Sequence, residues 1–156
     1  MKRLILESAG LLSLSALIAV TTYLIVGAPD RSVPCVQTDL EGDQVCLETV
    51  LKQWGGEVLW VDARSQAEFK KGRMAGALLI TETDADNMIA LPDNMEAIGM
   101  SGVQGKKLVV YCGTDACGGS KLVAKKIRDT GFHSEVFVLY GGWKAVLAGK
   151  VDFVSQ

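Results

Sequence analysis

From residue 43 onward, short apolar runs alternate with stretches whose apolar residues recur at helical spacing. The apolar runs predict buried strands at 58–61, 77–80, 107–111 and 136–140. The helical spacing predicts helices at 45–54, 65–71, within 86–100, at 120–129 and at 142–148. Strands that alternate with helices form a parallel sheet with helices on both faces. We therefore expect one α/β domain, and a chain of 156 residues has room for it beside a short extra segment.

The N-terminal segment has a different character. After Lys2 and Arg3, and a single acidic residue at Glu7, the 22 residues from 8 to 29 carry no charge. At the rise of an α-helix, this length crosses a hydrocarbon core of about 30 Å. We expect one uncleaved transmembrane helix, with residues 4–28 in the membrane. A cleaved signal peptide is the alternative, because a Val-Gly-Ala sequence near the end of the run resembles a small-residue cleavage site.

The expected organisation is a transmembrane anchor at 1–29, a linker at 30–43 and a globular domain at 44–156. The linker carries Pro, Asp, Ser and Thr without apolar periodicity. Positive charges at Lys2 and Arg3, with acidic residues in the linker, favour a cytoplasmic N-terminus. The domain is then expected on the periplasmic or extracytoplasmic side of the membrane.

Cys35 and Cys46 lie on either side of Gly42, where the linker meets the domain. In an oxidising compartment such a pair can form a disulfide. Two buried thiols are an equal alternative, because the distance between the two residues cannot be read from the sequence.

Charge and composition argue against two classes of site. The net charge is −2 and the pI is near 5.4, and no cluster of Lys or Arg is interleaved with aromatic residues, so we expect no nucleic-acid partner. The chain has a single histidine, and the spacing between its last two cysteines differs from the Cys-x-x-Cys pairs of zinc sites. We therefore expect no metal and no cofactor.

The segment between the strand at 107–111 and the helix at 120–129 is rich in glycine and contains two cysteines. Cys112 follows the strand directly, at the edge of the sheet where α/β proteins bind ligands. A glycine-rich turn before a helix aims backbone N–H groups and the positive end of the helix dipole into the turn, and this field favours a thiolate. Cys112 is therefore a candidate nucleophile; the alternative is a small buried apolar residue. The rest of the expected active-site loop is Gly113, Thr114, Asp115, Ala116, Cys117, Gly118, Gly119 and Ser120.

Three ordered motifs resemble the rhodanese-like sulfurtransferase domain family. They comprise Val61-Asp-Ala-Arg64 with Glu68-Phe69, Gly72 and Gly76-Ala77; Val109-Val-Tyr-Cys112; and Gly131-Phe132, Val138-Leu139, Gly141-Gly-Trp143 and Gly149. The resemblance covers about residues 44–152. It implies a rhodanese-like parallel sheet with helices on both faces, which here follows the expected N-terminal transmembrane helix.

By this resemblance, Cys112 accepts a sulfane sulfur as a persulfide and passes it to a thiophilic acceptor. The implied partners are a small sulfur donor (thiosulfate, a polysulfide or a persulfide) and a thiol or cyanide as acceptor; the sequence indicates no particular protein partner. Two alternatives remain open at this point: a thiol-disulfide switch, and a catalytically silent rhodanese-like binding module at the membrane.

The loop departs from the common pattern of the family at Cys117, which stands where an arginine is frequent. Cys117 either attacks the persulfide on Cys112, which releases sulfide and leaves a disulfide between the two residues, or packs without a chemical role. The first interpretation is the thiol-disulfide switch.

The loop also lacks a cation. Asp115 is its only charged residue, and Gly118 stands where rhodanese-like phosphatases have the arginine that binds oxyanions. We therefore expect no phosphatase activity. The same lack of a cation makes thiosulfate, a dianion, less suitable as a donor than polysulfides or persulfides.

Asp62, Arg64 and Glu68 are expected to support the scaffold. Arg64 and Glu68 lie four residues apart at a predicted helix start, a spacing that favours an ion pair. His133 follows a helix stop and is expected in a surface turn. Trp143 is expected to pack at the last turn.

Overall fold

The computed structural model describes residues 21, 35–40, 42–113, 118–149 and 151–155. The chain divides into two units, Met1–Arg31 and Ser32–Gln156. Within the described residues, no helix combines the length and the apolar character needed to cross a membrane. The transmembrane helix expected at 4–28 lies outside the described residues, apart from Thr21.

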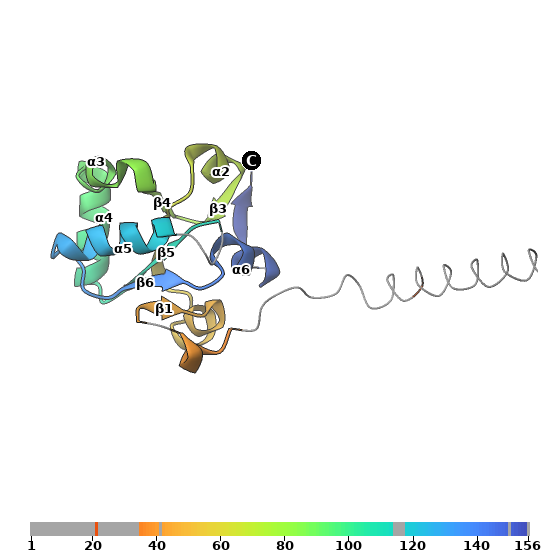
Figure 1. The fold of residues 1–156 in the computed structure, drawn as a ribbon. Coiled ribbons are helices and arrows are strands. Elements are labelled where there is room, and N and C mark those ends of the chain that lie inside the picture. The colour runs from red at the N-terminus through yellow and green to blue at the C-terminus, as the bar shows by residue number, and fades with distance from the viewer. Residues whose placement is uncertain (1–20, 22–34, 41, 114–117, 150, 156) are drawn as a thin grey trace, which may run out of the picture. The chain divides into compact units, whose positions relative to one another are not determined.

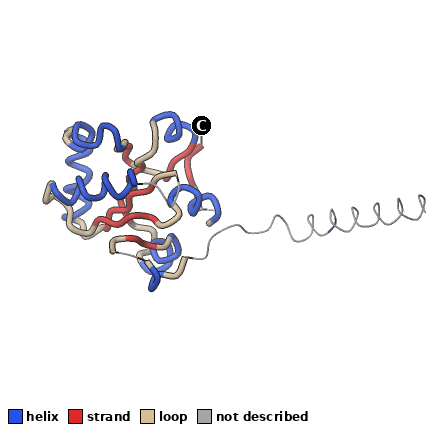
Figure 2. The backbone as a smooth tube through the Cα atoms, in the orientation of Figure 1, coloured by secondary structure: helices blue, strands red, loops and turns tan. Residues whose placement is uncertain are grey.

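The second unit is built on a five-stranded sheet in which each pair of neighbouring strands is parallel (Figure 1, Figure 2). The strand order is β1-β6-β5-β2-β4, so β5 is central. The strands are β1 (Gln44–Val45), β2 (Val58–Asp62), β4 (Leu78–Leu79), β5 (Lys107–Tyr111) and β6 (Val136–Leu139). The predicted parallel sheet is confirmed, and the segments that follow β2, β4 and β5 meet at one edge of it.

Helices cover both faces of this sheet, as expected. The α-helices are α2 (Gln66–Lys71), α3 (Ala85–Ile89), α4 (Pro92–Val103), α5 (Gly118–Asp129) and α6 (Gly142–Ala148). Three short helical turns are η1 (Gln37–Asp39), η2 (Thr49–Gln53) and η3 (Glu82–Asp84). One apolar cluster joins the sheet to α3, α4 and α5, and a second joins it to η2 and α6.

The central strand divides its side chains between these two clusters. Leu108, Val110 and Cys112 belong to the cluster of α5, whereas Val109 and Tyr111 belong to that of α6. This alternation follows from the two-residue period of a strand. Because both faces are buried, the strand is a nearly continuous apolar run, as the sequence showed. The Cys112 side chain therefore lies on the α5 face of the sheet.

The helix predicted at 45–54 begins later than expected. Gln44 and Val45 form β1, which pairs with β6, and the N–H of Tyr140 donates to the Val45 carbonyl at 2.9 Å. Val45 and Leu47 fit both the helical spacing and strand alternation, so the sequence pattern there was ambiguous. The free edge of β6 decides the outcome, because its N–H groups at Val138 and Tyr140 donate to the carbonyls of Asp43 and Val45.

Two further features were not anticipated. A small antiparallel sheet joins β3 (Gly72–Met74) to β7 (Phe153–Ser155), two segments far apart in the sequence. The helical stretch within 86–100 consists of two helices, because Pro92 is the first residue of α4 and starts a new helix.

Candidate active site

Cys112 lies at the carboxyl end of the central strand β5. Its side chain is 2% exposed and packs in the apolar cluster beneath α5. The residue is present as a thiol. The structure thus brings the candidate nucleophile to the edge of the sheet where the segments after three parallel strands meet.

The first turn of α5 contacts this sulfur. Ser120, the third residue of α5, is 3% exposed, and its hydroxyl donates a hydrogen bond to the Cys112 sulfur over 3.5 Å. The backbone N–H groups in the first turn of a helix have no acceptor within the helix, and the helix dipole is positive there. A negatively charged sulfur is therefore favoured at this position.

Only part of the predicted loop belongs to the described residues. Gly113, Gly118, Gly119 and Ser120 are described, whereas Thr114, Asp115, Ala116 and Cys117 lie outside the described ranges. Among the described residues, no group of three or more His, Cys, Asp or Glu side chains is arranged to hold a metal ion.

Backbone hydrogen bonds hold the end of β5 from two sides. The N–H of Ala63, just after β2, donates to the Tyr111 carbonyl at 2.8 Å. The N–H of Trp143, in α6, donates to the Cys112 carbonyl at 2.6 Å. The main chain of Cys112 is thus attached to α6, while its sulfur contacts α5.

The partner of Arg64 differs from the one expected. Arg64 pairs with Asp62, and its Nη2 and Nε atoms lie 2.6 and 2.9 Å from the Asp62 carboxylate oxygens. Nη2 also donates to the Gly72 carbonyl at 2.6 Å. The expected ion pair between Arg64 and Glu68 was therefore wrong. The physical reason is burial: Asp62 and Arg64 have side chains that are 0% and 4% exposed, and a buried charge needs a buried partner.

Aromatic rings complete the surroundings of Arg64. Its guanidinium lies 4.1 Å from the Trp143 ring centroid and 5.5 Å from that of Tyr111. The Tyr111 and Trp143 rings stack with centroids 5.7 Å apart.

Burial raises the pKa of Tyr111, and the Asp62 charge raises it further. Burial lowers the pKa of Arg64, but the hydrogen bond and charge of Asp62 outweigh this effect, so its pKa is raised. Trp143 packs as expected.

Glu68 acts at the start of α2. The Ser65 hydroxyl and backbone N–H donate to Glu68 Oε2 at 2.6 and 3.2 Å, and the Glu68 N–H donates to the Ser65 hydroxyl. This is a capping box, which satisfies backbone groups that the helix leaves open. The hydrogen bond from the Ser65 hydroxyl lowers the pKa of Glu68. Glu68 thus supports the scaffold through Ser65.

A second carboxylate near the site was missed in the sequence. Glu82, the first residue of η3, lies against the first turn of α5: its Oε2 is 2.5 Å from the place that a Cβ on Gly119 would occupy. The signal was available, because Glu82 follows β4, whose carboxyl end lies at the same edge as Cys112.

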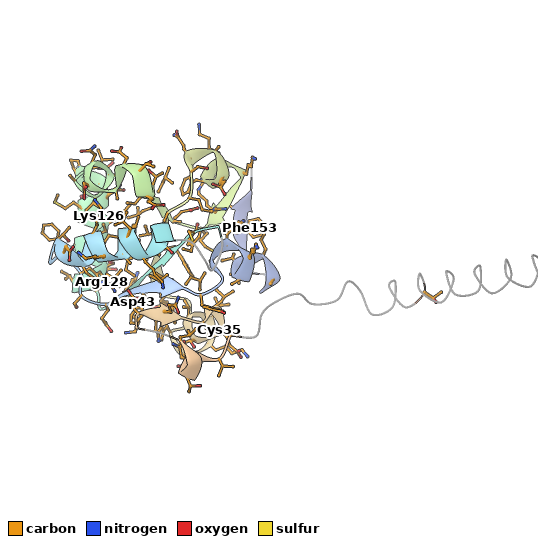
Figure 3. The ribbon with its side chains drawn as sticks, in the orientation of Figure 1. Cys35, Asp43, Lys126, Arg128 and Phe153 are labelled. Atoms are coloured by element: carbon orange, nitrogen blue, oxygen red, sulfur yellow. A yellow bond between two sulfur atoms is a disulfide. The ribbon has the colours of Figure 1, made fainter. Side chains whose placement is uncertain are left out.

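At another corner of the domain, Cys35 and Cys46 form a disulfide. Gln37 lies beside it, and its side-chain oxygen accepts a hydrogen bond from the Cys46 N–H at 3.0 Å. Asp43, three residues before Cys46, forms an ion pair with Arg128 of α5 (Figure 3). The part of the predicted linker that follows Cys35 is therefore attached to the domain by a covalent bond.

His133 does not lie in a surface turn, so that expectation was wrong. Its side chain is 4% exposed, and Nε2 donates to the Lys106 carbonyl at 2.8 Å. The ring packs against Gly102 of α4, where the absence of a side chain leaves room for it. Because Lys106 precedes β5, His133 lies at the sheet edge opposite to Cys112 and takes no part in the site.

Solved structures with little sequence identity share this fold. A rhodanese-related protein from Thermoplasma volcanium matches with a TM-score of 0.53 and 15% identity, over 74% of this chain and 100% of that chain. The rhodanese-like domain of an Anabaena sp. protein matches with a TM-score of 0.52 and 21% identity, over 74% and 81%. A Rhodopseudomonas palustris protein of unknown function, described as a possible tyrosine phosphatase, matches with a TM-score of 0.53 and 21% identity, over 79% and 100%. At such identities the likeness establishes the fold alone.

The sequence itself gives a more direct assignment. No curated protein matches it significantly. The family model of the rhodanese-like domain matches residues 48–148, which is more than half of the chain. The matched range contains Cys112, Ser120 and the pair of Asp62 and Arg64. The chain therefore belongs to the rhodanese-like domain family.

Proposed function

We propose that this chain is a sulfurtransferase that carries sulfane sulfur as a persulfide on Cys112. The observation that carries the proposal is the contact of the Cys112 sulfur with Ser120 in the first turn of α5. The hydroxyl donor and the helix dipole stabilise a negative sulfur before and after a second sulfur atom is added. Rhodanese-like domains include catalytically silent modules, so family membership supports the fold, whereas this contact supports the chemistry.

The reaction has two displacements. The Cys112 thiolate attacks the sulfane sulfur of the donor and forms an S–S bond. The bond between that sulfur and the rest of the donor breaks, and the leaving group departs with the electron pair, as sulfite from thiosulfate or as a thiolate from a persulfide. A thiolate or cyanide then attacks the outer sulfur, and Cys112 leaves as a thiolate.

The surroundings of Cys112 favour sulfur transfer over phosphoryl transfer. A phosphatase of this fold needs an arginine that binds the oxyanion through two hydrogen bonds. Gly118 stands at the corresponding loop position, and Arg64 is engaged with Asp62 and the Gly72 carbonyl. A phosphate dianion therefore finds no matching cation among the described residues at this edge of the sheet.

The test is the intact mass of the full chain after exposure to thiosulfate and, separately, to a polysulfide. The chain is first treated with reductant mild enough to leave the disulfide of Cys35 and Cys46 intact, and the reductant is removed before the donor is added. We expect a gain of one sulfur atom in the native chain and none in Cys112→Ser. Thermal unfolding of both proteins establishes that the variant is folded.

Other outcomes support other functions. A folded native chain that gains no sulfur from either donor contradicts the proposal and favours the silent binding module. A loss of two hydrogen atoms after sulfur exposure, absent from Cys117→Ser, favours a switch between Cys112 and Cys117. A gain of sulfur that persists in Cys112→Ser assigns the carrier to another residue.

We further propose that residues 4–28 anchor the chain in a membrane and that the domain faces the periplasmic or extracytoplasmic side. The uncharged run from 8 to 29 supports the anchor. The disulfide of Cys35 and Cys46 supports the side, because disulfides persist in oxidising compartments. In spheroplasts, added protease is expected to digest the domain. Protection of the domain until the membrane is lysed contradicts this orientation.

A further inference from the structure

Both described ends of the active-site loop carry a glycine that faces a carboxylate. A Cβ placed on Gly113 would lie 3.8 Å from Glu68 Oε1, and one placed on Gly119 would lie 2.5 Å from Glu82 Oε2. Gly113 directly follows Cys112, and Gly119 directly precedes Ser120, which contacts the Cys112 sulfur. Two carboxylates therefore lie beside the glycines that adjoin Cys112 and Ser120, one from the segment after β2 and one from the segment after β4.

Glu68 is fixed in place as an anion. Its Oε2 accepts both hydrogen bonds from Ser65, which leaves Oε1 as the oxygen nearer to Gly113. The Ser65 hydrogen bond lowers the pKa of Glu68, so the charge is retained at neutral pH. The side chain thus combines a role in capping α2 with a negative charge at the start of the loop.

Glu82 places its charge at the end of α5 that interacts with Cys112. The carboxyl carbon and the Cβ of Glu82 also lie close to Gly119, at 3.1 Å and 3.2 Å from the same Cβ position. Any residue other than glycine at position 119 would place its Cβ against Glu82 and displace that side chain. A carboxylate here opposes the positive end of the α5 dipole and reduces its attraction for an incoming anion.

Among the described residues, Arg64 and Lys71 lie near enough to Glu68 to lower its pKa, but no cation forms an ion pair with Glu68 or Glu82. Arg64 is buried and paired with Asp62. Lys121 follows Ser120 in α5, but it shares the exposed face of the helix with Lys125, which pairs with Asp129. Ser120 lies on the opposite, buried side with Val123 and Ala124.

We propose, on the basis of the sulfurtransferase function proposed above, that Glu82 and Glu68 select the sulfur donor by its charge. They disfavour the thiosulfate dianion and favour uncharged or singly charged donors, such as an organic persulfide. At the same distance, the Coulomb repulsion between a dianion and a carboxylate is twice that between a monoanion and the carboxylate. Glu82 is therefore a specificity-determining residue, and its effect grows with the charge of the donor.

The test compares donors that transfer the same atom but differ in charge. Thiosulfate, a dianion, and methanethiosulfonate, a monoanion, both give a persulfide on Cys112, with sulfite and methanesulfinate as leaving groups. In Glu82→Gln at low salt, we expect the rate constant to rise about tenfold with thiosulfate and about threefold with methanethiosulfonate. At about 1 M salt, where the screening length is about 3 Å, both increases are expected to disappear.

Glu135→Gln is the matched control. It removes the same charge, but Glu135 pairs with Lys107, the first residue of β5, at the sheet edge opposite to Cys112. We expect neither donor to change its rate by more than about 1.5-fold, because the Coulomb interaction of an exposed charge falls with distance and is weakened by the high dielectric constant of water. An equal rise in Glu135→Gln and Glu82→Gln shows an effect of net charge and overturns the proposal.

A second measurement does not depend on sulfur transfer. Iodoacetate, a monoanion, and uncharged iodoacetamide both alkylate the Cys112 thiolate and release iodide. We expect Glu82→Gln to raise the ratio of their rates at Cys112 about threefold. An unchanged ratio overturns the charge selection. If the ratio rises but the native chain gains no sulfur from any donor, the sulfurtransferase function fails while the electrostatic effect of Glu82 stands.

Discussion

Two corners of this domain contain cysteine, and the chain is held by different kinds of interaction at each. At one corner, Cys35 and Cys46 form a disulfide, and the covalent bond itself holds the chain. At the other, Cys112 keeps its thiol, and the corner is held by the buried pair of Asp62 and Arg64 and by backbone hydrogen bonds. The sulfur transfer proposed for Cys112 needs a sulfur that is not held in a crosslink. This corner, the proposed reactive corner, therefore depends on non-covalent contacts that the other corner does not need.

The largest effect on stability is expected at the reactive corner. Arg64→Met leaves the Asp62 carboxylate buried without its partner, which costs about 3–5 kcal/mol of the free energy of unfolding. Urea unfolding measures this loss. The double variant Asp62→Asn with Arg64→Met is expected to lose less than Arg64→Met alone, because the buried charge is then removed. An equal or greater loss in the double variant contradicts a dominant role for the ion pair.

Removal of the disulfide is expected to cost somewhat less. The double variant Cys35→Ser with Cys46→Ser loses about 3 kcal/mol, because the unfolded chain gains the freedom that the crosslink restricted. Sulfur uptake by Cys112 is expected to persist. The reciprocal result is expected for Cys112→Ser, with no sulfur uptake and a stability change of about 1 kcal/mol. The comparison of the two corners fails if disulfide removal abolishes uptake in a folded protein.

A smaller effect is expected at Ser120. Ser120→Ala removes the hydroxyl that donates to the Cys112 sulfur, and a hydrogen bond to a charged group contributes about 1.5 kcal/mol, which corresponds to about a tenfold slower formation of the persulfide. The matched control is Ser101→Ala in α4. Ser101 is also buried, but its hydroxyl donates to the Ile98 carbonyl, away from the site. Equal rates in the two variants would show that the Ser120 hydroxyl has no role in the chemistry.

The sequence predicted those parts of the fold that depend on local patterns. The strand at 107–111 and the helices at 120–129 and 142–148 follow from continuous apolar runs and helical spacing, and the structure has β5, α5 and α6 there. Contacts between distant segments were not predictable in this way. The pairing of β3 with β7, and of Val45 with β6, depends on which backbone edges remain free once the central strands have formed.

The same distinction holds for the candidate site. The position of Cys112 at the end of β5 followed from the order of the strand and the glycine-rich loop. The partner of Arg64 did not, because spacing suggested Glu68 whereas burial selects Asp62, two residues earlier on the strand. The burial of His133 likewise depends on the space beside Gly102, which belongs to a different helix. Spacing identifies neighbours along the chain, but desolvation decides which of them pair.

The smallest effect expected is that of pH on the Glu68 cap. The Ser65 hydrogen bond lowers the pKa of folded Glu68 below its ordinary value of 4.5, so the stabilisation is fully present above that value and is lost as the pH falls through the lower, folded pKa. A carboxylate at a helix N-terminus contributes about 0.5 kcal/mol. Glu68→Gln keeps the hydrogen bonds of the cap without the titrating charge, so the stability difference between the two proteins is expected to shrink in this acidic range. Urea unfolding at pH values on both sides of the range measures that difference. A stability difference that does not change with pH would show that Ser65 stabilises protonated and charged Glu68 equally. The pKa of Glu68 would then not be lowered, and the argument that Glu68 is held as an anion would fail.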